Sequence, residues 1–261
     1  EPVAQGAIAL AGHWGLNKLI AFYDSNNAQI SGKVDRSDST NYSQVFEGFG
    51  WHVQEIDGHD HEKIREAIEK AQVVDRPSLI IGNTIMAKGA ANVEGDHETH
   101  GAPLDPDEIK ATKEKLGLPQ EQFYLPNEVV EHFQSRFKTL SDSSQQWKSQ
   151  IDSASQNNDF DVAWKSVHQT TYPELEYPTF DAGTKLATRK AFGATLDKFA
   201  DQIPNLIGGS ADLEPSNYTG NFATKFGDFS KTNRTGRNLA LSLIHISEPT
   251  RRTPISYAVF C

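Results

Sequence analysis

The sequence has almost no cysteine, no long apolar run and no signal-peptide pattern. Its single cysteine is Cys261, the last of 261 residues, so neither a disulfide framework nor a cysteine-based zinc site can be built. No apolar run approaches the ~18 residues of a membrane span, and the first residues lack a basic and then apolar stretch. These absences fit a reducing, cytoplasmic location and a protein without a membrane partner.

An excess of positive charge is also missing. The sequence has 25 Lys+Arg against 35 Asp+Glu, a formal net charge of −10, and it has no basic stripe with interleaved aromatic residues of the kind that nucleic acid requires. We therefore expect no nucleic-acid partner. A small anionic ligand is still compatible with this charge, because backbone N–H groups and a metal can hold a phosphate on an acidic protein.

The sequence does contain enough apolar residues to build a core, because 37% of its residues are hydrophobic. Apolar runs predict strands at residues 19–23, 51–56 and 78–81, separated by helices near 42–47 and 64–71. This alternation predicts an α/β fold with a parallel sheet flanked by helices. Because the first run lacks polar alternation, its strand is predicted to be buried on both faces.

The rest of the chain predicts a connection, a linker and a second domain. Residues 86–105 form a long glycine-rich, polar connection of a kind that is usually functional or disordered. Asp105 then reads as the N-cap of a helix, followed by Pro106 and Glu108. Polar helix-forming residues predict a helical linker, and after it an amphipathic helix leads to a strand at 206–207. The residues expected on the apolar face of that helix are Leu186, Phe192, Leu196 and Phe199.

Three polar clusters follow or flank predicted strands, at 24–28, 97–104 and 208–217. Ligands of open parallel sheets bind beyond the carboxyl ends of the strands, and Asn26 carries a neutral oxygen suited to Mg²⁺ or Ca²⁺. On spacing alone, each cluster also has a plainer interpretation. Asn26-Asn27 fits a turn with positive φ, while His97 and His100 fit a surface loop or two ligands of a zinc ion.

Other polar groups are ambiguous in the same way. Gly208-Gly-Ser210 fits a loop that brings backbone N–H groups near an anion, although it lacks the lysine of a P-loop. The acidic and histidine-rich run at 57–62 looks like a metal cluster but is better explained as the start of a helix. Arg189, taken alone, is an ordinary solvated charge on a helix.

Taken together and in this order, the motifs resemble transketolase, the thiamine-diphosphate enzyme of the pentose phosphate pathway. The resemblance covers residues 1 to about 240. It implies a homodimer that transfers a two-carbon ketol unit from a ketose phosphate to an aldose phosphate. The motifs that carry it are Leu10-Ala-Gly-His13, Tyr23-Asp-Ser-Asn26, His100-Gly-Ala-Pro-Leu104, Ala187-Thr-Arg189-Lys190 and Gly208-Gly-Ser-Ala-Asp212-Leu-Glu-Pro-Ser216-Asn217.

The resemblance also implies cofactor-binding residues. The side chain of Asn26 and the backbone carbonyl of Ala28 would bind Mg²⁺, for which Ca²⁺ or Mn²⁺ could substitute, and the metal would hold the diphosphate. Ile30 would lie against the cofactor rings. His100 would face the cofactor as well, and Asp212 would lie near it across the dimer interface.

For the sugar substrate, the resemblance implies three residues. His100 would also face the hydroxyls of the donor sugar and act as the catalytic residue. Arg189 and Ser216 would hold the phosphate end of the sugar. A sibling carboligase such as dihydroxyacetone synthase or a phosphoketolase is the alternative enzyme, and a non-catalytic α/β binding module is the alternative of another class.

The sequence departs from the family at both ends. The Gly-Asp-Gly that opens the family's metal motif is absent, and after Ala240 the chain diverges just before the expected Arg-Glu-His. Residues 241–261 resemble the translation of a sequencing adapter. The alternative is a natural divergent strand with a turn at Pro254. We therefore expect an internal, inactive fragment with four parts. They are residues 1–118 from the diphosphate-binding domain, a linker at 119–179, residues 180–240 from the pyrimidine-binding domain, and a non-native tail at 241–261.

Overall fold

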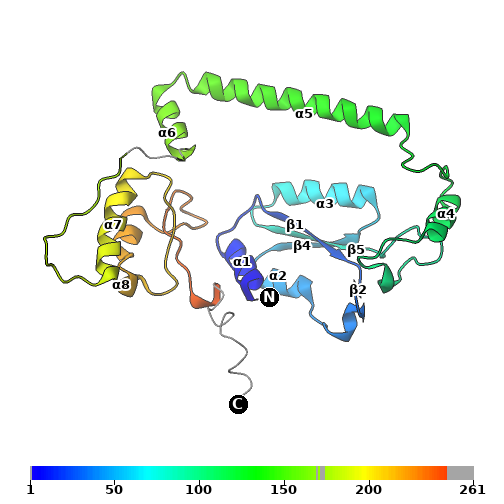
Figure 1. The fold of residues 1–261 in the computed structure, drawn as a ribbon, viewed down its shortest axis with the longest axis horizontal. Coiled ribbons are helices and arrows are strands. Elements are labelled where there is room, and N and C mark those ends of the chain that lie inside the picture. The colour runs from blue at the N-terminus through cyan, green and yellow to red at the C-terminus, as the bar shows by residue number, and fades with distance from the viewer. Residues whose placement is uncertain (1, 169, 171–173, 246–261) are drawn as a thin grey trace, which may run out of the picture. The chain divides into compact units, whose positions relative to one another are not determined.

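The computed structural model describes residues 2–168, 170 and 174–245, which divide into two units (Figure 1). The first unit is Gly15–Phe137, and the second contains the described residues before and after it. Of the tail expected to be non-native, residues 246–261 lie outside the described residues, so that expectation stays a prediction, as do the domain boundaries.

Three parallel strands form the centre of the first unit, as the sequence predicted. They are β1 (Ile20–Ser25), β4 (His52–Asp57) and β5 (Ser78–Asn83), in the order β1-β5-β4. The register places Tyr23 beside Ile81 and Ile81 beside Glu55. Since the strands are parallel, all three carboxyl ends lie at the same edge of the sheet.

The central strand is β5, whose residues 78–82 are buried. The prediction that β1 is buried on both faces is wrong, because Phe22 and Tyr23 are 47% and 37% exposed. Among the described residues β1 pairs only with β5 and so lies at an edge of the sheet. An apolar run identifies a strand, but its place in the sheet depends on which strands pair with it.

Two helices cover opposite faces of the sheet, α2 (Tyr42–Gly48) and α3 (His61–Val73) (Figure 1). Helix α3 begins at Asp60, whose carboxylate accepts hydrogen bonds from the backbone of residues 62 and 63. Its buried alanines face the sheet, and Gln54 Nε2 donates to the Ala67 carbonyl at 2.9 Å. The acidic residues at the start of α3 therefore cap a helix, as the sequence analysis favoured.

The segments after β1 and β5 are short irregular structures that carry polar residues. A hairpin of β2 (Ala28–Gln29) and β3 (Gly32–Lys33) follows β1, with the 3-10 turn η1 (Val34–Arg36) after it. The connection after β5 contains the 3-10 turn η2 (His97–Thr99) and leads to α4 (Pro106–Lys115). Asp105 caps α4 through the backbone N–H groups of residues 107 and 108, which confirms that prediction.

Two helices occupy most of the predicted linker, α5 (Asn127–Ala154) and α6 (Asn158–His168). Neither has a buried residue, and Trp147 and Trp164 meet with ring centroids 6.2 Å apart. No helix in the described part of the chain is long and apolar enough to cross a membrane.

The second unit contains α1 (Pro2–His13), α7 (Thr188–Gln202), α8 (Glu214–Asn217), α9 (Gly220–Phe226) and the 3-10 turn η3 (Leu243–His245). The strand predicted at 206–207 is not formed. Isolated parallel bridges occur instead, and they join Gly208 with Asn238, Asp228 with Asn238, and Ala211 with Leu241. Leu186 precedes α7 rather than lying on it.

Arg237 joins these bridged segments to the end of α7. Its guanidinium donates to the carbonyls of Leu206 at 2.8 Å, Ala200 at 3.0 Å and Ile203 at 2.8 Å. It also lies 3.9 Å from the ring centroid of Phe226. Burial lowers the pKa of Arg237, but a guanidinium stays protonated in proteins. One side chain therefore binds three carbonyls at the end of α7 and in the turn after it, and the one on Ile203 also accepts the N–H of Leu206.

We predict that Arg237→Ala lowers the free energy of unfolding of the second unit by about 2–3 kcal/mol, because the carbonyls lose charge-assisted partners. The free energy of unfolding of Arg237→Lys should lie between those of Arg237→Ala and the parent. The ammonium of lysine keeps the charge but lacks the planar, forked donors of a guanidinium. Urea denaturation measures the change in the free energy of unfolding, and hydrogen exchange of the α7 amides locates it. The exposed Lys185→Ala is the control. An Arg237→Ala chain as stable as the parent would contradict this role.

Candidate functional site

A tight turn follows β1 where the sequence predicts metal-binding oxygens. Asn26 Oδ1 accepts the backbone N–H of Ala28 at 3.0 Å, and Asn27 has a φ of +51°. The turn interpretation of Asn26-Asn27 is therefore confirmed, which by itself excludes no ligand. Asn26 and Ala28 are half-buried, while Ile30 at the tip of the hairpin is 75% exposed.

His100 lies directly after a turn that contacts this hairpin. The turn η2 lies against β3, so the segment carrying Ala28 and the segment carrying His100 are joined within one unit. Asp96 Oδ1 accepts the N–H of Glu98 at 2.9 Å and starts the turn. His100 is exposed, and His97 Nδ1 is buried with no hydrogen-bond partner among the described residues.

The connection that carries His100 is tied down by two carboxylates. Glu94 accepts from the backbone N–H of Gly89 at 3.0 Å and from the Nζ atoms of Lys88 at 3.2 Å and Lys115 at 3.4 Å. Glu108 on α4 accepts from the backbone and side-chain nitrogens of Asn92. These bonds fix residues 88–94 of the connection to one another and to α4.

The same hydrogen bonds change the acidity of both carboxylates. The backbone N–H of Gly89 and then the ammonium of Lys88 lower the pKa of Glu94. The backbone and side chain of Asn92 lower the pKa of Glu108. Both groups are therefore held as carboxylates, because hydrogen bonds to the charged form favour it.

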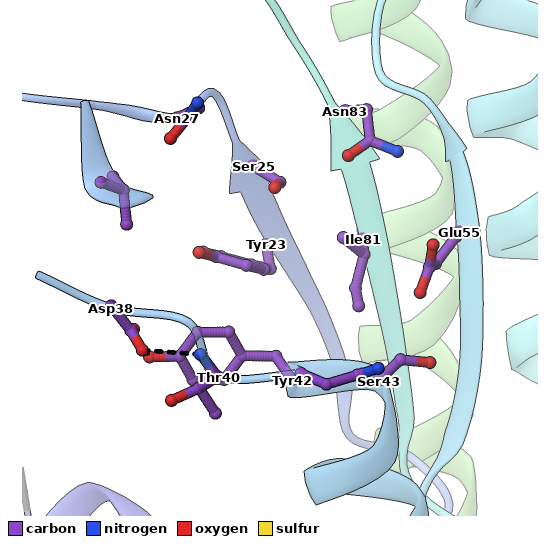
Figure 2. A pocket seen from close by; sticks show the side chains of 12 residues that line it. Tyr23, Ser25, Asn27, Asp38, Thr40, Tyr42, Ser43, Glu55, Ile81 and Asn83 are labelled. Carbon is purple, nitrogen blue, oxygen red and sulfur yellow. Dashed lines mark hydrogen bonds between the residues drawn. The ribbon is translucent and has the colours of Figure 1, made fainter. Parts of the chain in front are cut away.

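A cavity of about 390 Å³ lies between the sheet and the segment before α2, and Figure 2 shows the side chains that line it. Tyr42 Oη donates to Asp38 Oδ2 at 2.5 Å. Hydrogen bonds from the side chains of Thr40 and Tyr42 lower the pKa of Asp38 to about 2. The hydrogen bond to Asp38 in turn raises the pKa of Tyr42. No Lys, Arg or His lines the cavity, and Asp38 and Glu55 give it negative charge. It is therefore a poor site for a phosphate.

The residues that follow β4 form a second hollow, but they do not form a metal cluster. His59 Nε2 accepts the backbone N–H of Ile85 at 2.8 Å, and Asp57 Oδ1 accepts the N–H of His59 at 2.9 Å. Within the described ranges, no three His, Cys, Asp or Glu side chains come together as metal ligands. The zinc interpretation of His97 and His100 thus finds no third ligand of these types there.

Arg189 lies in the first turn of α7 in the second unit. Ala187 is the N-cap of this helix and provides no side-chain hydrogen bond, and Arg189 is exposed. A cation at a helix N-terminus opposes the helix dipole. The free N–H groups and the guanidinium together therefore favour an anion at this end of α7.

Helix α8, which carries Ser216, packs on α7 one turn after Arg189. A Cβ at Gly193 would lie 2.5 Å from Tyr218 Cβ and 3.0 Å from the Tyr218 carbonyl oxygen, so glycine permits this close approach. Ser216 is exposed, and Asp212, in the loop before α8, is exposed with a φ of +60°. The second unit thus brings the α7 N-terminal half and α8 together.

The glycines before this loop take part in backbone pairing and close packing. The N–H of Gly208 donates to the Arg237 carbonyl at 3.2 Å. A Cβ at Gly209 would collide with the backbone of Leu239. Ser210 Oγ accepts from the Leu213 N–H at 3.2 Å. The N–H of Gly208 is therefore already paired, and the anion-loop interpretation stays a prediction for the rest of Gly208-Gly-Ser210.

The site residues fall into two groups. Asn26, Ala28, Ile30 and His100 belong to the first unit, and Arg189, Asp212 and Ser216 belong to the second. Sequence reasoning missed the anchoring roles of Glu94 and Glu108. No local pattern indicates the role of Glu108, because its partner Asn92 lies 16 residues away.

Residues 1–168 of this chain match the family model described as "Transketolase, thiamine diphosphate binding domain". The chain belongs to the transketolase family. Transketolase from Bacillus subtilis is 36% identical over 260 residues, which cover 91% of this chain and 37% of that protein.

Solved transketolases have the same fold. The enzyme from Campylobacter jejuni superposes with a TM-score of 0.83 at 34% identity, covering 94% of this chain and 37% of that one. A variant from Pichia stipitis in complex with fructose 6-phosphate superposes with a TM-score of 0.85 at 30% identity, with 94% and 38% covered. The chain therefore spans little more than a third of the length of these relatives.

The connection carrying His100 should respond to acid. Because the folded-state pKa values of Glu94 and Glu108 are lowered, their contribution to stability is complete above the ordinary value of 4.5 and is lost as the pH falls through the lowered values. We predict that the NMR amide resonances of Gly89 and Asn92 shift with midpoints below 4.5. Midpoints at or above 4.5 would show that the carboxylates do not hold this segment.

Proposed function

We propose that the whole protein to which this chain belongs is a transketolase, which transfers a two-carbon ketol unit from a ketose phosphate to an aldose phosphate with thiamine diphosphate as cofactor. The observation that supports this most directly is the contact between the hairpin of β2 and β3 and the turn before His100. It gathers metal-type oxygens and an imidazole beyond the carboxyl ends of a parallel sheet, where such folds bind ligands.

Asn26 and Ala28 are proposed to hold the divalent metal. A side-chain amide and a backbone carbonyl are hard, neutral oxygen donors that suit Mg²⁺, with Ca²⁺ or Mn²⁺ as substitutes. Asn26 Oδ1 already accepts one N–H, but an amide oxygen has a second lone pair for a metal. Because both donors are neutral, we expect this pair to bind a metal weakly without the negative charge of the diphosphate.

Thiamine diphosphate supplies the carbanion-stabilising chemistry when it is bound, and this chain positions the groups around it. Ile30 presents an exposed apolar side chain toward the cofactor rings in this proposal. His100 is the proposed catalytic residue. From its exposed position it would donate a hydrogen bond to a hydroxyl of the sugar or accept its proton.

Arg189 and Ser216 are proposed to bind the phosphate of the sugar. The uncapped N-terminus of α7 and the guanidinium both favour an anion, and Ser216 adds a neutral donor from a helix packed on α7. This pair favours a phosphorylated sugar as substrate, and donor and acceptor specificity assays on the whole protein separate a transketolase from dihydroxyacetone synthase.

The remaining assignments concern the assembly. We propose a cytoplasmic homodimer in which Asp212 lies near the cofactor across the interface. The positive φ of Asp212 holds its backbone in a sparsely populated conformation, as residues at ligand sites often are.

Binding of fructose 6-phosphate to the full chain tests the sugar-phosphate assignment. We predict chemical-shift changes at Arg189 and Ser216 with fructose 6-phosphate but not with fructose. Arg189→Gln should weaken binding about tenfold, because it removes a charge-assisted contact, while the matched Lys185→Gln should have no effect. Equal binding of both sugars, or an unaffected Arg189→Gln variant, would contradict the assignment.

A further inference from the structure

The connection between β5 and α4 must hold His100 in place although most of it is irregular. Glu108 is the carboxylate that anchors it from α4, and its residue is only 8% exposed. A buried carboxylate is rare unless its oxygens are hydrogen-bonded. Its partners therefore show what it does.

Both oxygens of Glu108 bind one residue of the connection. Oε1 accepts the backbone N–H of Asn92 at 2.9 Å, and Oε2 accepts Asn92 Nδ2 at 2.8 Å. Thr112 Oγ1, one turn along α4, lies 3.4 Å from Oε1. The carboxylate acts as an acceptor on every side, which only the ionised form can do.

Neighbouring residues of the connection bind the same face of α4. The backbone N–H of Ala91 donates to Thr112 Oγ1 at 3.0 Å, and Lys115 Nζ donates to the Ala90 carbonyl at 2.7 Å. Positions 108, 112 and 115 follow helical spacing and lie on one stripe of the helix. Three consecutive residues of the connection are therefore fixed to three residues of α4.

The anchored segment leads directly to the turn of His100. The N–H of Gly95 donates to the Met86 carbonyl at 2.8 Å and closes the loop. The turn η2 begins after Asp96 and rests on β3. The path from Asn92 to His100 thus runs between two fixed points, α4 and the hairpin.

We propose that Glu108 is a positioning residue for His100, which keeps the turn before it on the hairpin of β2 and β3. The catalytic meaning of this position rests on the function proposed above, but the positioning itself does not. Glutamine in place of glutamate would put an NH₂ group beside an N–H donor of Asn92, so the substitution removes an acceptor as well as the charge.

The experiment compares Glu108→Gln with Glu114→Gln in the full chain, without cofactor or substrate. Glu114 lies on α4 as well but is exposed. In Glu108→Gln we expect hydrogen exchange of the amides of residues 89–100 to rise about tenfold and the imidazole resonances of His100 to shift. In Glu114→Gln neither should change, and exchange in β5 should be unaffected in both variants.

Two results would overturn the proposal. One is unchanged exchange in Glu108→Gln, and the other is faster exchange with unshifted His100 resonances, which would make Glu108 merely structural. If Glu108→Gln does not fold, Thr112→Val is used in its place, because it removes the hydroxyl beside Glu108 at nearly equal volume. It should also raise the exchange of residues 89–100 and shift the His100 resonances. These readouts are independent of ketol transfer, so a chain without that activity would refute the proposed function and leave this inference standing.

Discussion

The parallel pairing of β1, β5 and β4 is the constraint on which the candidate site depends. Parallel strands end at one edge of their sheet, and β1 and β5 are direct neighbours there. The hairpin that follows β1 and the connection that follows β5 must therefore leave the sheet side by side. The contact between β3 and the turn before His100 is the consequence. Segments far apart in the sequence are therefore brought together because two strands pair in parallel.

Sequence patterns predicted those parts of the fold that local physics decides. The three strands, the helix start within residues 57–62, the cap at Asp105 and the turn at Asn26-Asn27 depend on side chains within a few residues. The exposure of β1, the burial of Glu108 and its bonds to Asn92 depend on residues brought together by folding, and no local pattern encodes them. The sequence could therefore name candidate site residues from motifs, whereas the bonds between Glu108 and Asn92 that anchor the connection could not be predicted.

The second unit depends on close backbone approach more than on strands. Gly193 and Gly209 leave room for neighbouring backbone, and Arg237 satisfies the carbonyls after α7. Asn238 is fully buried and donates to Glu214 on α8 at 3.2 Å and to Asp228 at 2.6 Å. These contacts fix the short helix that carries Ser216 against α7. Gly209, one of the two glycines of the predicted anion loop, thus has a packing role in the structure.

The central claim is that the metal and the diphosphate bind at the sheet edge beside the hairpin. Paramagnetic broadening of NMR signals by Mn²⁺ with thiamine diphosphate tests it most directly, because broadening falls steeply with distance from the ion. The account predicts the strongest broadening at Asn26, Ala28 and Ile30, reaching His100 and sparing residues 57–60. Broadening centred on residues 57–60, or spread evenly over the acidic surface, would contradict it.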